Sequence, residues 1–170
     1  MDAAYVQTRL GDPHYQLLDV RSPEEYRGVR VPTGLAGEQL KAGHIPTAAN
    51  VDYRLAWLDP TTKAFKPYPQ LLELYRGLDP SKTVIVYCQS GRRASFGYFT
   101  LRLMGFESVA LYDASWFEWG NPRTYFPIET EEHRFSASPA AAPFQHAATE
   151  RIPGSRTQAP VKGGYVSCGG

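Results

Sequence analysis

Cysteine is scarce in this chain of 170 residues, which contains only Cys88 and Cys168. Two cysteines so far apart do not make a disulfide framework, and the sequence has no Cys-x-x-Cys or His-x-x-His pair of the kind that binds zinc. We therefore expect no metal site, and both thiols could stay free in a reducing, cytoplasmic setting.

An excess of either charge is also missing, since 18 Lys and Arg residues stand against 17 Asp and Glu residues. A balance of this kind argues against nucleic acid as the main partner. The N-terminal stretch has no basic start followed by a long apolar run, so we expect no signal peptide. The longest apolar runs of the whole chain are too short to span a bilayer, which argues against a membrane partner.

The spacing of apolar residues predicts strands and helices that alternate along the chain. The predicted strands are 15–20, 48–53, 82–88 and 108–113, and the predicted helices are 22–28, 68–78, 93–105 and 115–120. Segment 82–88 is β-branched and apolar at consecutive positions, as in a strand buried on both faces. Ser22 and Glu25 form a capping-box pattern at one helix start. This order predicts an α/β domain with a mostly parallel central sheet flanked by helices.

The composition changes from about Phe126, after which Ala, Ser, Pro, Gln and Gly are frequent and apolar periodicity is absent. We expect one catalytic domain over residues 1–129. Residues 130–170 are expected to form a Pro-, Ala- and Gly-rich tail that is either disordered or laid along the domain.

The stretch YCQSGRRAS holds Cys88 at the end of a predicted strand, where parallel α/β domains place their sites. A helix that begins near Arg93 would direct its unpaired N–H groups at this loop, and Ser90 and Gly91 suit a backbone that curls into an anion nest. Such surroundings favour a thiolate, so we expect Cys88 to be a nucleophile. Arg92 and Arg93 add fixed positive charge that suits an anionic reactant.

Over roughly residues 5–129, the chain resembles the rhodanese (sulfurtransferase) family. The matching segments are LLDVRSPEEYRG, GHIPTAANVDY, VIVYCQSGRRAS and SVALYDASWFEWGN. The resemblance is greatest to the catalytic C-terminal half of tandem-domain thiosulfate and mercaptopyruvate sulfurtransferases. It implies that Cys88 takes sulfane sulfur from a small anionic donor such as thiosulfate and holds it as a persulfide. The acceptor would be cyanide, a thiol or a sulfur-carrier protein, and no cofactor would be needed.

The resemblance also implies roles for other residues. The loop Gln89–Arg93 would bind the donor and stabilise the persulfide, and Arg21 and Arg27 would contact the donor's anionic group. Pairing with a carboxylate such as Asp19 is the alternative for Arg21. The tandem enzymes complete this site with an N-terminal domain, so here we expect a more open cleft, or one covered by the tail or a second chain.

Cys168 is a candidate relay thiol that would accept the persulfide sulfur or form a resolving disulfide with Cys88. The alternative is an incidental cysteine at a frayed end. Asp19 and His44 are expected to hold loops. Trp116 and Trp119 are expected to pack against the core or to lie at the rim of the cleft.

Four other functions are weighed against the leading one. Phosphatases related to rhodanese use Cys-x5-Arg, whereas Ala94 stands six residues after Cys88, so phosphatase activity is disfavoured. By resemblance, mercaptopyruvate enzymes usually have an uncharged loop, whereas tandem enzymes of the thiosulfate type place basic residues within it. Arg92 and Arg93 occupy the last two loop positions here, so neither loop pattern is copied, but the added charge favours thiosulfate. A protein-to-protein persulfide relay or a redox-sensing interaction module stays open, and the presence of Cys88 argues against the module.

Overall fold

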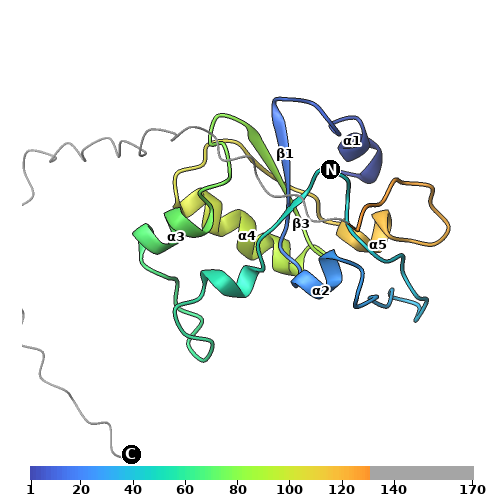
Figure 1. The fold of residues 1–170 in the computed structure, drawn as a ribbon, viewed down its shortest axis with the longest axis horizontal. Helices are drawn as coiled ribbons and strands as arrows, with labels where there is room; N and C mark the ends of the chain where they lie inside the picture. Colours follow the sequence, from blue (N-terminus) through green and yellow to red (C-terminus); the bar gives the residue numbers. More distant parts are fainter. Residues whose placement is uncertain (131–170) are drawn as a thin grey trace, which may run out of the picture.

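The computed structural model describes residues 1–130, which fold around a four-stranded sheet (Figure 1). The strands are β1 (Tyr15–Asp19), β2 (Ala49–Asn50), β3 (Thr83–Tyr87) and β4 (Val109–Leu111). They lie in the order β2-β1-β3-β4, and every pairing is parallel. The predicted α/β class with a parallel sheet is therefore confirmed.

Five α-helices and one 3-10 helix of the described chain surround this sheet. They are α1 (Ala3–Gln7), α2 (Pro23–Tyr26), η1 (Tyr53–Ala56), α3 (Tyr68–Leu74), α4 (Arg92–Leu103) and α5 (Ser115–Trp119). Four of them were predicted, and α2 begins with the expected capping box of Ser22 and Glu25. The sequence reasoning missed α1 and η1, which are too short to show an apolar period and lack the Ser-x-x-Glu capping pattern that marks α2.

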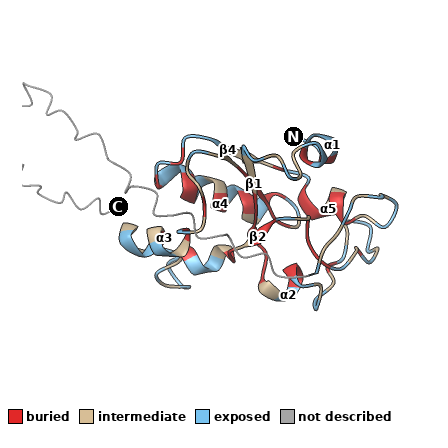
Figure 2. Cartoon of the chain, turned by 45° about the horizontal axis from the view of Figure 1, so that its top comes forward, coloured by how far each residue is buried: buried red, intermediate tan, exposed pale blue. Residues whose placement is uncertain are grey.

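The core lies on both faces of the sheet because successive strand residues point to opposite sides. Leu18, Val84 and Val86 pack on the face that carries α3 and α4. On the other face, Leu17 and Ile85 pack in a second cluster that includes residues of α1 and α5. Figure 2 shows the buried strands between these layers. The fully buried Trp116 and Trp119 belong to the second cluster, as a core role predicts.

Helix α4 packs very closely against the sheet at Gly97. A Cβ at Gly97 would lie 3.0 Å from Val20 Cγ1 and 3.2 Å from Val86 Cγ1, so a larger residue would push the helix outward. The short connection 88–91 places the N-terminus of α4 near the carboxyl end of β3. The carboxyl end of β1 lies beside it, because β1 and β3 pair in register from Tyr15 to Asp19.

The expected tail falls largely, and Cys168 wholly, outside the described residues. Residues 131–170, which hold most of the expected tail and Cys168, are not among the described residues.

Within residues 1–130, no helix combines the length and the apolar character needed to cross a membrane.

Candidate active site

A tight connection joins β3 to α4 and begins with Cys88. Gly91 is the N-cap of α4 with a φ of 78°, in the left-handed region that glycine adopts readily. A Cβ at Gly91 would lie only 2.5 Å from Asp113 Oδ1 and 2.6 Å from the Asp113 carbonyl oxygen. The close approach of segment 112–117 and the backbone angle both require glycine here. Helix α4 therefore starts at Arg92, one residue before the predicted start.

Ser115 fixes this loop from the other side. Its buried hydroxyl accepts hydrogen bonds from the backbone N–H groups of Cys88 (3.1 Å) and Gly91 (3.2 Å). The same hydroxyl donates to the carbonyl oxygen of Tyr112 at 2.7 Å. Ser115 itself has a φ of 54°, which is unfavourable for a residue with a side chain. The sequence reasoning assigned Ser115 no role, although it lies in the matching segment SVALYDASWFEWGN.

Two of the loop's N–H groups are thus bonded to a serine hydroxyl rather than left to face an anion. An anion nest at this loop would depend on the N–H groups of Gln89 and Ser90. The first-turn N–H groups of α4 would add to it, since the first N–H groups of a helix have no intrahelical acceptor. The backbone N–H groups of Trp116 and Phe117 also donate to the carbonyl oxygens of Cys88 and Gln89, at 3.1 and 2.9 Å. Helix α5 therefore holds the loop's shape.

Cys88 is fully buried at the carboxyl end of β3. It packs in the same core cluster as Leu18 and Val86. Burial alone would lower the pKa of Arg93, but its hydrogen bonds to Glu25 and the charge of Glu25 raise it, and a negative charge at Cys88 would act in the same direction. Arg93 is therefore a permanent cation close enough to interact with a thiolate at Cys88.

A cavity of about 530 Å³ adjoins this loop. Its wall has a polar part and an aromatic part. The polar part consists of Glu25, Arg30, Lys63, Gln89, Ser90, Arg92 and Arg93, and the aromatic part of Tyr53, Trp57 and Phe96. Of the described residues that we expected in the loop site, Gln89, Ser90, Arg92 and Arg93 line the cavity, whereas Cys88 and Gly91 do not.

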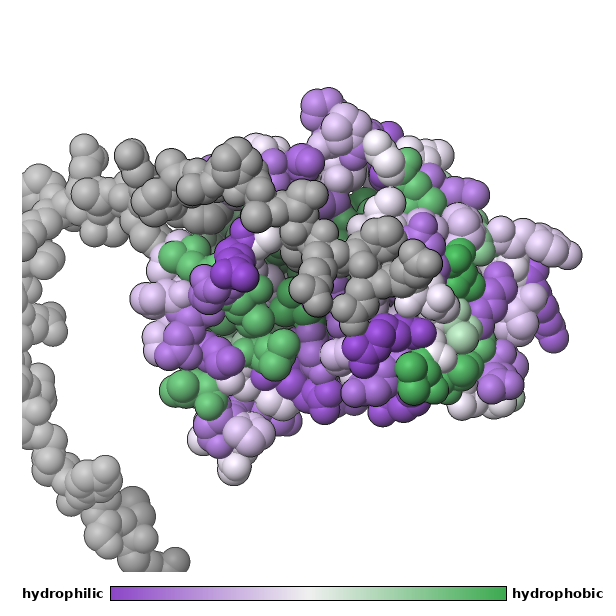
Figure 3. Space-filling model, viewed as in Figure 1, coloured by the Kyte–Doolittle hydropathy of each residue, from purple (hydrophilic) through white to green (hydrophobic). Residues whose placement is uncertain are grey.

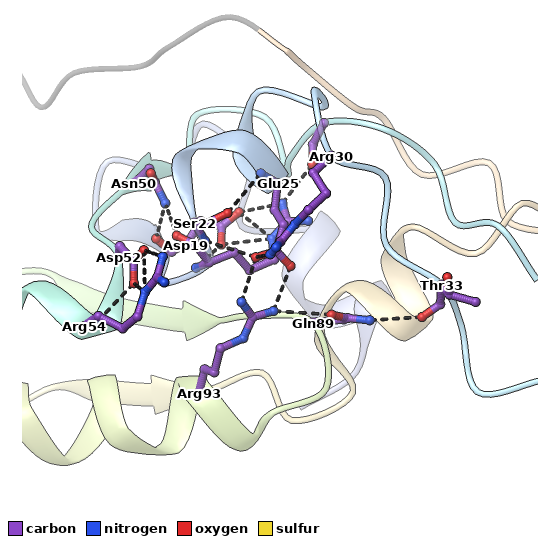
Figure 4. A network of polar contacts seen from close by, with 12 residues as sticks. Asp19, Ser22, Glu25, Arg30, Thr33, Asn50, Asp52, Arg54, Gln89 and Arg93 are labelled. Carbon is purple, nitrogen blue, oxygen red and sulfur yellow. Dashed lines mark hydrogen bonds and ion pairs between the residues drawn. The ribbon is translucent and has the colours of Figure 1, made fainter. Parts of the chain in front are cut away.

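Glu25 is the centre of the polar wall, as Figure 4 shows. Arg93 donates two hydrogen bonds to its carboxylate, at 2.7 and 2.9 Å, and Arg30 lies 2.7 Å from Oε2. The Ser22 N–H also donates to Oε2, at 3.2 Å, which completes the capping box. Burial alone would raise the pKa of Glu25, but the hydrogen bonds and charge of Arg93 lower it to about 2. Glu25 therefore stays ionised at neutral pH.

Gln89 links the loop to the segment that follows α2. Its Nε2 donates to the carbonyl oxygen of Thr33 at 3.0 Å, and its Oε1 accepts from Arg93 at 3.4 Å (Figure 4). Through Gln89 and Glu25, one arginine of α4 is tied to two separate parts of the chain. The sequence reasoning missed this network, because its members are close only once β1 and β3 lie side by side.

Neither Arg21 nor Arg27 lines the cavity of the described chain. Arg21 is fully buried, donates to Asp19 Oδ2 at 2.9 and 2.6 Å and to Asp19 Oδ1 at 3.0 Å, and reaches the Gly43 carbonyl oxygen at 2.8 Å. This is the alternative role that we gave to Arg21. Arg27 is the exposed C-cap of α2. Contact of these two arginines with a donor stays a prediction, and Arg30 is the arginine of this segment that reaches the cavity.

His44 and Asp19 lie where they can hold loops. The His44 ring stacks on Tyr26 with ring centres 3.6 Å apart, and its Nδ1 is 2.8 Å from the Tyr26 carbonyl oxygen. Asp19 accepts from the Arg21 N–H at 2.9 Å. Neither residue lines the cavity formed by the described residues. Within the same part of the chain, no group of three or more His, Cys, Asp or Glu side chains is arranged to hold a metal ion.

The sequence of the chain is similar to a family profile and to relatives with names that refer to sulfur transfer. The sequence profile of the Rhodanese-like domain matches residues 2–122. A thiosulfate sulfurtransferase of Corynebacterium glutamicum is 43% identical over 121 residues, covering 69% of this chain and 39% of the relative. The sulfur carrier protein TtuD of Thermus thermophilus is 42% identical over 110 residues, covering 62% of this chain and 38% of the relative. The chain thus spans about two fifths of the length of these relatives.

A solved structure supports the same fold. The Tum1 protein of Saccharomyces cerevisiae superposes with a TM-score of 0.60 at 26% sequence identity. The match covers 70% of this chain and 42% of Tum1. Both the sequence and the backbone therefore match parts of longer proteins.

Proposed function

The chain belongs to the family of rhodanese-like domains, and from this premise we propose that it transfers sulfane sulfur from thiosulfate to a thiophilic acceptor through a persulfide on Cys88. The observation that carries the proposal is the setting of Cys88. It begins a constrained loop that runs into the N-terminus of α4, beside a cavity with four cationic side chains. Relatives named thiosulfate sulfurtransferase support the donor.

The reaction has two half-reactions. The Cys88 thiolate attacks the outer sulfur of thiosulfate, the sulfur–sulfur bond of the donor breaks, and sulfite leaves with the bonding electron pair. The enzyme then carries Cys88–S–S⁻. In the second half-reaction the acceptor attacks the outer sulfur of the persulfide, and the Cys88 thiolate is regenerated. Sulfur is moved without net oxidation, so neither half-reaction needs a further redox partner.

The polar wall of the cavity suits the first half-reaction. Thiosulfate and sulfite are anions, and Arg92 and Arg93 supply charge that does not titrate near neutral pH. The N-terminus of α4 adds partial positive charge at the same place. The outer sulfur of a persulfide extends about 2 Å beyond Sγ, and we place it at the cavity floor, where an acceptor can reach it although Cys88 itself is buried.

The charge of the loop also bears on the choice of donor. Arg92 and Arg93 favour the doubly charged thiosulfate over the singly charged mercaptopyruvate, since each added arginine strengthens binding of the more highly charged ion. Mercaptopyruvate sulfurtransferase activity is therefore the weaker alternative for the same site.

A second candidate function is delivery of the sulfur to a protein. The relative from Thermus thermophilus named as a sulfur carrier protein favours it. In this version the persulfide chemistry at Cys88 is the same, and a partner's thiol takes the place of the small acceptor. A role for Cys168 in such a relay stays a prediction from the sequence.

The proposed function is tested by thiocyanate formation from thiosulfate and cyanide. We expect turnover by the wild-type chain, none by Cys88→Ser, and slower turnover when mercaptopyruvate replaces thiosulfate. Faster turnover with mercaptopyruvate would reverse the assignment of the donor. Persulfide loading without turnover on cyanide would favour delivery to a protein.

A further inference from the structure

The cavity beside Cys88 is much larger than the proposed donor. Its volume of about 530 Å³ falls within the range of roughly 300–1,000 Å³ that is typical of sites for drug-sized organic ligands. Thiosulfate, sulfite and cyanide each fill only a small part of such a space. The first half-reaction therefore leaves most of the cavity wall without a ligand, including its whole aromatic part.

The aromatic part is a preformed surface. Tyr53 and Trp57 meet edge to face with ring centres 5.1 Å apart, and Phe96 lies 6.1 Å from Tyr53 and 6.4 Å from Trp57, also nearly perpendicular. Phe65 stacks on Phe96 at 5.0 Å and supports it from behind. Tyr53, Trp57 and Phe96 remain partly exposed. A planar ring that entered the cavity would thus meet aromatic faces already fixed in place.

The polar part of the wall is mainly cationic. It holds the four basic side chains of Arg30, Lys63, Arg92 and Arg93 and one carboxylate, that of Glu25. Arg93 and Arg30 already bind Glu25, so no carboxylate among the described lining residues remains to neutralise Arg92 or Lys63. Lys63 Nζ lies 5.9 Å from the centre of the Trp57 ring, which brings positive charge to the border of the aromatic surface. On the face seen in Figure 3, a hydrophobic area lies beside strongly hydrophilic ones.

From this two-sided cavity, and resting on the proposed function, we propose that the sulfur acceptor is a small organic thiol that carries both an aromatic ring and an anionic group. The ring lies against Tyr53, Trp57 and Phe96, and the anion is bound by Arg92 and Lys63. The thiolate of the acceptor attacks the outer sulfur of Cys88–S–S⁻. The products are the acceptor's persulfide, R–S–S⁻, and the Cys88 thiolate, so atoms and charge balance.

The second half-reaction can be measured alone. Wild-type protein is loaded with thiosulfate, freed of excess donor, and mixed with 4-mercaptobenzoate, with thiophenol or with 3-mercaptopropionate. The first thiol has a ring and an anion, the second only a ring and the third only an anion. The loss of about 32 Da from the protein is followed by intact mass. Because these thiols differ in intrinsic nucleophilicity, each rate is divided by that of the same thiol with a small-molecule disulfide.

We expect 4-mercaptobenzoate to have the highest normalised rate. Trp57→Ala should lower its normalised rate about tenfold relative to 3-mercaptopropionate, which corresponds to about 1.4 kcal/mol of ring contact. Trp57→Phe should keep most of the wild-type ratio between the normalised rates of 4-mercaptobenzoate and 3-mercaptopropionate. Lys63→Gln should lower the rate of 4-mercaptobenzoate relative to thiophenol.

Two matched controls change residues that do not line the described cavity. Tyr125→Ala removes an aromatic side chain that is 99% exposed, and Lys66→Gln removes a lysine near Lys63 that does not line the described cavity. Neither control should change the ratios. Loading with thiosulfate shows that each variant is folded and competent in the first half-reaction.

Two outcomes would overturn this inference. Equal normalised rates for the three thiols would do so, as would the same ratios in wild type and Trp57→Ala. In both cases thiosulfate still adds sulfur to Cys88, so the proposed function stands. If thiosulfate adds no sulfur to the wild-type chain, the proposed function itself fails.

Discussion

The ion pair of Glu25 with Arg93 gives a stability prediction with a defined pH dependence. The change is Glu25→Gln. Glutamine keeps the size of the side chain and suits a capping box, but it removes the charge that binds Arg93 and Arg30. The free energy of unfolding should therefore fall at neutral pH, although the fold and the α2 cap are retained.

The magnitude follows from the pKa of Glu25, which is lowered from its ordinary value of 4.5 to about 2. One pKa unit corresponds to 1.36 kcal/mol, so the charged form contributes at most about 3 kcal/mol. Solvent around the largely exposed Arg30 screens part of this attraction, and a loss of about 2 kcal/mol is a better expectation.

The sign of the pH effect is fixed by the direction of the pKa shift. A carboxylate whose pKa is lower in the folded state stabilises the protein fully above its unfolded pKa. That stabilisation is lost as the pH falls from about 4.5 through about 2. The difference in unfolding free energy between wild type and Glu25→Gln should therefore be constant from pH 7 to pH 5 and shrink towards zero near pH 2.

Urea unfolding at pH 7, 5, 3.5 and 2.5 measures this difference. Glu73→Gln is the matched control, because Glu73 pairs with Arg76 at 2.6 Å but both side chains are well exposed. Its effect should stay below about 1 kcal/mol at every pH. A loss in Glu25→Gln that is the same at pH 7 and pH 2.5 would refute the electrostatic reasoning, since protonation removes only the charge.

Three further changes test the loop. Gly91→Ala should destabilise the chain by about 2 kcal/mol or more and reduce persulfide loading, because a Cβ there meets Asp113 and the backbone has a positive φ. An unchanged urea midpoint together with unchanged loading would contradict the requirement for glycine at this position. Ser115→Ala should lower the free energy of unfolding by about 2 kcal/mol and reduce persulfide loading, since two buried N–H groups lose their acceptor; wild-type stability and loading in Ser115→Ala would contradict this role of the hydroxyl. Arg92→Gln should raise the KM for thiosulfate more than that for mercaptopyruvate; equal changes in steady-state kinetics would exclude a selective role for its charge.

The parts of the fold that the sequence predicts best are those with a local signal. Segment 82–88 is apolar on both faces because core clusters cover both faces of β3, and this burial is visible as an unbroken apolar run. Ser22 and Glu25 are three residues apart, so their capping box is also visible. Helices α1 and η1 leave no such signal, and the predicted strand 48–53 shortens to Ala49–Asn50 because Asp52 caps η1.

The site is harder to predict where it depends on pairs distant in sequence. Glu25 could be recognised as a capping residue, but its bonds to Arg93 arise only when β1 and β3 bring the two loops together. The aromatic surface likewise joins Tyr53 and Trp57, in and after η1, to Phe96 on α4. Arg21 follows Asp19 by two residues, and its side chain folds back onto that carboxylate. Its contact with a donor, which the motif implies, stays a prediction.

The central claim is that Cys88 carries the transferred sulfur, and intact mass after incubation with thiosulfate tests it most directly. The account predicts a gain of about 32 Da in the wild type and in Cys168→Ser, with the extra sulfur mapped by peptide mass to Cys88. Cys88→Ser should gain nothing. A wild-type chain that stays at its original mass, or a Cys88→Ser chain that still gains the sulfur, would contradict the claim.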